Sequence, residues 1–450
     1  MPENITASQE SPVDMDKQRA RLADWQSTDS KTFESPSIAE LYGQRAKRFA
    51  DIVQLKQPDR VPTLMLSAGI VPRYSGITFA DTYYNAEKVV AATLKFIEDF
   101  QPEYTLFNGS ATGKAYDILG YNAYKWPGGN LPDNVPFQYI EAEYMPAEDY
   151  DALINNPEGY MLRTYLPRVC DNLQGLRLLP SMFSTVEMLG VGMWLGGLSA
   201  PPLMESLTRL AQAIDHVRNS MMTGMQTAAK IVGRYGCPGL VGGVAKAPFD
   251  LVADTLRGTR SALTDLYRRP DKLLAAAEAL VPAAIHAGVG SARPGPPPFV
   301  FMPLHKGASA FMSFKHFQKF YWPTFKRQLE GIIAAGMVPL CFVEGGYDEA
   351  RLELIAGSGL PAGRTVWLFD RSDMRAVKKH FTGFACFGGN VPNSLFSAGT
   401  VAEMEDYCRR LIDEMAPGGG FFISPGATVD EANPDNVRAF MTCTEKHGTY

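Results

Sequence analysis

Eight short apolar runs, spaced along the whole chain, constrain its fold more than any other feature of the sequence. Most of them break off in glycine or in a polar residue, and helical stretches separate many of them. Strands that alternate with helices build a parallel sheet that can close into a barrel. We therefore predict an α/β fold, a (β/α)8 TIM barrel, with the active site at the mouth where the runs end. The runs are 61–65, 104–107, 239–244, 299–302, 338–343, 365–369, 384–387 and 421–423.

The spacing of the runs departs from a simple barrel at one place. About 130 residues separate the second run from the third, whereas loops in such folds usually have 2–6 residues. We predict a barrel over 36–450 with residues 110–238 inserted between its second and third strands. The first 35 residues are polar and contain few large apolar side chains, so we expect a mobile N-terminal arm or loosely docked helices there.

Composition and charge exclude several classes of function. The formal net charge is -5 and the basic residues are scattered, which disfavours nucleic acid as a partner. The chain begins without the basic and apolar regions of a secretory signal, and no run reaches the ~18 uncharged apolar residues of a membrane span. Its six cysteines form no CxxC pair. We expect a cytoplasmic protein with reduced thiols that acts on a small molecule and does not bind membranes.

Three segments, read together, resemble the uroporphyrinogen decarboxylase superfamily, which also contains cobalamin-linked methyltransferases that act on thiols. This resemblance implies a TIM barrel over most of the chain. The segments are PDRVP at 58–62 with MLSAG at 65–69, APF at 247–249 with YRRP at 267–270, and GGNVP at 388–392 with NPDNVRAF at 433–440.

The chain departs from the decarboxylases of this superfamily at the residues that the resemblance implies for substrate binding. Two arginines grip substrate carboxylates in those enzymes, but Leu66 and Ile70 occupy the matching positions here. The aspartate expected after Phe107 is replaced by Asn108, the tyrosine by Asp254 and the last histidine by Ala427. We therefore expect no decarboxylation of uroporphyrinogen.

The thiolate zinc site of the methyltransferase branch is also missing, since its ligand positions hold Phe342, Glu344 and Ala427. Strand alternation nevertheless predicts that four run-end residues face the barrel axis together. They are His305, Glu344, Asp370 and Asn390.

Two ionised carboxylates in one mouth need a countercharge or a shared proton. One interpretation is a divalent metal, zinc by preference, bound by Glu344, His305 and Asp370. Another is a metal-free site in which Lys306 and Arg371 supply the charge. A third is that the two carboxylates only cap helices or form surface ion pairs.

We assign catalytic roles to Asp370, Glu344 and Lys306. We assign substrate binding to Asn108, Tyr84, Asn390 and Arg371. The leading hypothesis is metal-assisted methyl or alkyl transfer with a separate corrinoid protein as partner, because the chain has no cobalamin motif that we recognise. The alternatives are a decarboxylase or lyase acting on a carboxylated substrate, and a barrel that binds a ligand without catalysis. A homodimer is left open.

Overall fold

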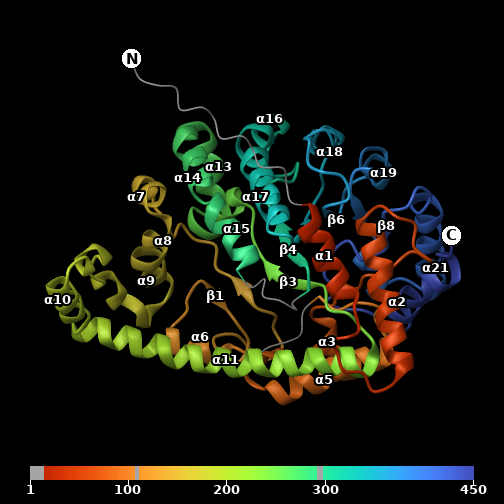
Figure 1. The fold of residues 1–450 in the computed structure, drawn as a ribbon, viewed down its shortest axis with the longest axis horizontal. Helices are drawn as coiled ribbons and strands as arrows, with labels where there is room; N and C mark the ends of the chain where they lie inside the picture. Colours follow the sequence, from red (N-terminus) through yellow and green to blue (C-terminus); the bar gives the residue numbers. More distant parts are fainter. Residues whose placement is uncertain (1–14, 107–110, 291–296) are drawn as a thin grey trace.

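The computed structural model describes residues 15–106, 111–290 and 297–450, and it has a parallel sheet at its centre (Figure 1). Six strands follow one another in the sheet in the order of the sequence. Their side-by-side parallel pairing, with helices between them, is the (β/α) arrangement that the apolar runs predict. The strands are β3 (Val241–Val244), β4 (Phe299–Leu304), β5 (Val338–Val343), β6 (Val366–Phe369), β7 (Cys386–Gly388) and β8 (Phe421–Phe422).

The first two apolar runs extend this sheet at its two edges through isolated bridges and do not form regular strands. Thr63 forms a parallel bridge with Ile423 beyond β8, and Thr105 forms one with Gly239 before β3. Pro62 lacks an N–H group, which limits the ladder that the first run can form. One side chain links the two runs. Glu103, which directly precedes the second run, accepts a hydrogen bond from the backbone N–H of Thr63 in the first run at 3.4 Å.

Alternate residues of the strands face two separate apolar cores. Phe301, Leu340 and Leu368 belong to the core inside the barrel. Their neighbours Met302 and Cys341 belong to the core between the strands and the surrounding helices. This alternation gives every strand an inward face that ends at the mouth of the barrel.

Helices cover the outside of the barrel. The stretch Pro270–Val289 is long and apolar enough to cross a membrane by length and composition alone, although its Leu273 and Ala284 are buried in this protein. The covering helices are α3 (Ile70–Ser75), α4 (Phe79–Tyr84), α5 (Ala86–Phe100), α12 (Pro248–Asp250), η5 (Leu251–Leu256), α13 (Thr259–Arg268), α14 (Pro270–Ala279), α15 (Val281–Val289), α16 (Phe314–His316), η6 (Phe317–Tyr321), α17 (Trp322–Ala334), α18 (Glu349–Ala356), α19 (Met374–Phe381), α20 (Asn393–Ser397), α21 (Val401–Met415) and α22 (Pro434–His447).

Two N-terminal helices, α1 (Met15–Gln26) and α2 (Pro36–Val53), close the end of the barrel opposite the mouth. Phe49 of α2 packs edge-on against Phe299, the first residue of β4, with ring centroids 5.3 Å apart. Leu22 and Trp25 of α1 are buried in the same inner core. Of the two expectations for this segment, α1 therefore matches the docked helix and not the mobile arm, because its apolar face fills the barrel floor. Residues 1–14 lie outside the described part.

Residues 111–238 lie between the second run and β3, and they extend to one side of the barrel (Figure 1). The long helix α11 spans the length of this insertion, and residues 138–139 form only a two-residue strand. The elements are α6 (Gly113–Leu119), β1 (Tyr124–Lys125), β2 (Gln138–Tyr139), η1 (Ala147–Asp149), α7 (Tyr150–Asn155), α8 (Pro157–Tyr160), η2 (Met161–Tyr165), α9 (Leu166–Val169), η3 (Asp171–Leu178), η4 (Met182–Thr185), α10 (Met188–Leu198) and α11 (Pro201–Tyr235).

Candidate functional site at the mouth of the barrel

The ends of β4, β5, β6 and β7 place four polar residues in one row. The ladder pairs Leu304 with Val343, and Val343 with Phe369, so the residues one step further are also neighbours. They share the inward parity of the barrel core. The structure thus brings together, in this order, the four residues that strand alternation predicts: His305, Glu344, Asp370 and Asn390.

His305 lies between two carboxylates. Its Nδ1 is 2.5 Å from Oδ2 of Asp254, and its Nε2 is 3.4 Å from Oε1 of Glu344. Asp254 also accepts contacts from two lysines, Lys246 Nζ at 2.9 Å and Lys306 Nζ at 3.2 Å. The carboxylate of Asp254 therefore contacts three basic side chains at the barrel mouth.

The charges of this cluster determine the protonation state of His305. Burial alone lowers the pKa of His305, but the hydrogen bonds and negative charges of Asp254 and Glu344 outweigh burial and raise the pKa to about 10. Burial likewise raises the pKa of Asp254, but the hydrogen bond from His305 and the charge of Lys246 hold it well below its usual range. At neutral pH, His305 is therefore an imidazolium and Asp254 a carboxylate.

Asp250 fixes the backbone of the loop that carries His305. Its fully buried carboxylate accepts hydrogen bonds from the N–H of His305 at 3.1 Å, from the N–H of Lys306 at 2.9 Å and from the hydroxyl of Tyr321 at 2.8 Å. Sequence reasoning assigned no role to Asp250 or Asp254. The available signal was two aspartates four residues apart, directly after the third apolar run, since residues i and i+4 share a helix face.

The predicted three-ligand metal site of Glu344, His305 and Asp370 is not assembled. Across the three described ranges, no group of three or more His, Cys, Asp and Glu side chains is arranged to hold a metal ion. Asp254, which the prediction omitted, contacts Nδ1 of His305, and Nε2 faces Glu344, whereas the contacts of Asp370 are with Gly345 and Arg371. Asp370 is therefore not grouped with the other two predicted ligands, and no step below is routed through a metal.

Asp370 lies beside the cluster with its own partners. Its Oδ2 accepts a hydrogen bond from the N–H of Gly345 at 3.1 Å. Burial raises the pKa of Asp370, and the nearby charge of Glu344 adds to this effect, against the opposing hydrogen bond from Gly345. Arg371 does not reach into the mouth as a substrate-binding residue would, because its side chain is 83% exposed and lies 3.6 Å from Asp370.

The remaining predicted substrate-binding residues have other roles or lie outside the described ranges. The amide nitrogen of Asn390 donates to the carbonyls of Asp370 and Ser372, so it holds the loop after β6. Tyr84 is hydrogen-bonded to Trp126 and Asp117 and is not among the residues that line the mouth cavity. Its neighbour on α4, Tyr83, lines that cavity instead. Asn108 is not among the described residues.

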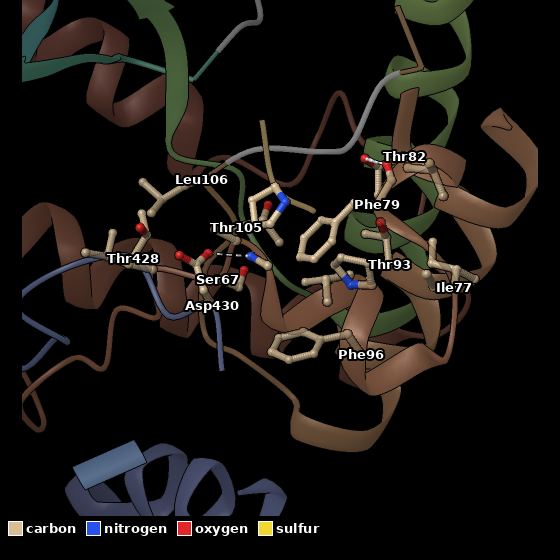
Figure 2. Close-up of a pocket in the computed structure, with 18 of the residues that line it drawn as sticks. Ser67, Ile77, Phe79, Thr82, Thr93, Phe96, Thr105, Leu106, Thr428 and Asp430 are labelled. Carbon is tan, nitrogen blue, oxygen red and sulfur yellow. Dashed lines mark hydrogen bonds between the residues drawn. The ribbon is translucent and has the colours of Figure 1, made fainter. Parts of the chain in front are cut away.

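A cavity of about 770 Å³ opens beside the ends of the first two runs (Figure 2). Phe79 and Phe96 form one side of it, and Ser67, Thr428 and Asp430 lie on the other. The cavity reaches the inner core at Phe301, which lies on the same strand and face as His305. None of the four residues of the charged row is among the described residues that line the cavity.

Comparisons with known proteins agree with this architecture. The sequence profile described as uroporphyrinogen decarboxylase matches residues 141–447, which is more than half of the chain. The chain belongs to the uroporphyrinogen decarboxylase family. A solved structure of a methyltransferase from Methanosarcina mazei has the same fold, with a TM-score of 0.57 and 14% identity over 90% of this chain and 98% of that one. No curated protein matches the sequence. Leu66, at the position where the resemblance implies a carboxylate-binding arginine in the decarboxylases, lines the apolar cavity.

Proposed function

We propose that this member of the uroporphyrinogen decarboxylase family transfers a methyl or alkyl group from a small molecule, with His305 as the general acid, to a corrinoid carried by a separate protein. One observation carries the proposal: the contact of Asp254 with Nδ1 of His305, which raises the pKa of a histidine whose side chain is 27% accessible at the mouth of the barrel. Methyl transfer from oxygen or nitrogen needs a proton on the leaving atom, and an imidazolium supplies one.

The reaction balances in atoms and charge. The bond between the methyl carbon and the leaving oxygen or nitrogen breaks, and its electron pair stays on the leaving atom. The Nε2–H of His305 donates its proton to that atom, and the neutral imidazole regains a proton from solvent. The reduced corrinoid of the partner supplies the electron pair for the new bond to the methyl carbon.

Neighbouring residues position the acid rather than react. Asp254 keeps Nδ1 of His305 protonated and directs Nε2 toward the mouth. Asp250 holds the backbone of His305 and Lys306 in place. Lys306, whose ammonium lies 4.3 Å from the ring centroid of Phe311, adds positive charge where negative charge develops on the leaving group.

A carboxy-lyase is the second candidate, because Asp370 is a carboxyl group whose pKa is raised at the same mouth. Such a group carries a proton to or from a carbanion more readily than an ordinary aspartate. This reading assigns the proton steps to Asp370 and Glu344, and it does not need a corrinoid partner.

The test combines the purified protein with cob(I)alamin, as the probe for the corrinoid partner, and three methyl donors: methoxybenzene, N-methylaniline and methylthiobenzene. We expect demethylated product from at least one donor. His305→Gln should lower the rate about 10²-fold or more, while the control His286→Gln, an exposed histidine of α15, leaves it unchanged.

Two results would contradict methyl transfer. One is the absence of product from all three donors with folded protein. The other is release of carbon dioxide from 4-methoxybenzoate that depends on Asp370 and not on His305, which would establish the carboxy-lyase instead.

A further inference from the structure

We infer that the mouth cavity binds an uncharged, mainly apolar substrate with an aromatic ring, and this inference rests on the proposed function. The lining carries the argument. Most of its surface comes from apolar and aromatic side chains, among them Met65, Val71, Phe79, Phe96 and Phe301. A cavity of about 770 Å³ lies within the ~300–1,000 Å³ range of small-molecule pockets.

The charge of the cavity excludes a carboxylated ligand. Among the described lining residues, Asp430 is the only charged one, and none is lysine, arginine or histidine. Oδ1 of Asp430 accepts a hydrogen bond from the N–H of Gly69 at 2.9 Å. A ligand carboxylate bound here would be desolvated with no cation to pair with and would face a second negative charge.

Hydroxyl groups at the open side of the cavity provide the polar contacts. Ser67, Thr105 and Thr428 lie near Asp430, whereas the opposite wall holds Phe79 and Phe96 (Figure 2). A ring packed against the aromatic wall would therefore direct an ether or amine substituent toward the hydroxyls and the mouth.

Calorimetric binding of a matched pair of probes tests this inference without turnover. We expect 2-methoxynaphthalene to bind at least tenfold more tightly than 6-methoxy-2-naphthoate, which differs by one carboxylate. Ser67→Arg, at an exposed lining position, should reduce or reverse that preference. Ser394→Arg, at an exposed serine of α20 away from the cavity, should not.

Equal or tighter binding of the naphthoate by the unmodified protein, or no binding of either probe, would overturn the substrate class. Binding of 2-methoxynaphthalene without any methyl transfer would contradict the proposed function and leave the cavity assignment intact. The two failures are therefore distinguishable.

A different observation carries a second inference, that the insertion joins two copies of this chain. Seven large apolar side chains on η4 and α10 are 55–87% exposed, and we call them the α10 patch. Helix α10 has no buried residue and lies at the far end of the insertion, away from the barrel (Figure 1). The patch consists of Met182, Phe183, Val186, Met188, Leu189, Met193 and Leu195.

The size and charge of the patch favour a second copy as its occupant. The seven side chains present on the order of 900 Å², close to the ~800 Å² that each partner buries in a standard interface. Glu187 is the only charged residue between 179 and 204, so a partner with a charged surface gains no complementary contact. A Cβ at Gly192 or Gly196, four residues apart on α10, would meet nothing within 4 Å, which leaves room for a close second helix.

Sedimentation equilibrium at micromolar concentrations tests this second inference. We expect a dimer for the unmodified chain and a monomer for the double variant Phe183→Glu with Leu189→Glu, with unchanged melting temperature. Met225→Glu, at a 71% exposed methionine of α11 outside the patch, should remain dimeric. A monomeric unmodified chain, a dimeric double variant, or binding of the monomer to phosphatidylcholine vesicles would each overturn it.

Discussion

Asp254 lies 2.5 Å from Nδ1 of His305 although 51 residues separate them in the sequence. Asp254 comes from η5, after β3, and His305 from the end of β4. Neighbouring strands of the barrel bring the two together, and the contact helps to raise the pKa of the histidine at the mouth to about 10.

Removal of the Asp254 charge should lower the pKa of His305. In Asp254→Asn the imidazolium loses its nearest carboxylate while Lys246 and Lys306 stay close, so we expect a decrease of about one to three units. Nitrogen NMR shifts of the His305 ring over a pH series measure it. Asp373→Asn, at the N-cap of α19, serves as the control. An unchanged titration would show that Asp254 does not set the protonation of His305.

The raised pKa of His305 predicts a dependence of stability on pH with a definite sign. The pKa rises on folding from its ordinary value of 6.5 to about 10. The stability that this group contributes is therefore fully present below about pH 6.5 and is lost as the pH rises through 10. Urea unfolding of the unmodified chain and His305→Gln from pH 6 to 10 should give curves that converge with rising pH. A constant difference would contradict the linkage.

Asp250 should contribute more to stability than any single one of its partners. Asp250→Ala leaves two backbone N–H groups and the Tyr321 hydroxyl without their acceptor, and we expect a loss of about 3 kcal/mol in the free energy of unfolding. Tyr321→Phe removes one of these hydrogen bonds and should cost about 1 kcal/mol. Chemical denaturation measures both. Equal losses would mean that the buried carboxylate has no organising role.

Glu103 should stabilise the barrel where its first and second apolar runs meet. Its buried carboxylate binds Arg48 at 2.8 Å, at a position where its side chain is only 5% exposed. Glu103→Ala leaves that arginine buried without this partner, so we expect a loss of about 3–5 kcal/mol. Asp59, which binds the same arginine but is 62% exposed, is the matched control, and Asp59→Ala should cost less than about 1 kcal/mol. Similar losses in both variants would contradict this account.

The strand ends could be predicted from the sequence because alternation is a local property. The inward parity of Phe301 and Leu340 follows from the backbone geometry of a strand, and it correctly identifies His305 and Glu344 as neighbours at the mouth. The apolar runs likewise predict the order of the strands in the barrel. The sequence left open whether residues 1–35 form a mobile arm or docked helices, because their polar composition hides the few apolar residues, Leu22 and Trp25, that reach the barrel floor.

The sequence by itself determined the family, the (β/α) order of the elements and the row of polar residues at the strand ends. Only the tertiary structure decided what these residues do. Asp254 reaches His305 from another strand-to-helix connection, and that contact raises the pKa of the histidine, which the sequence had suggested only as a metal ligand. Local patterns specify which way a side chain points. Protonation depends on every charge that folding brings within a few ångströms, whatever its distance along the chain.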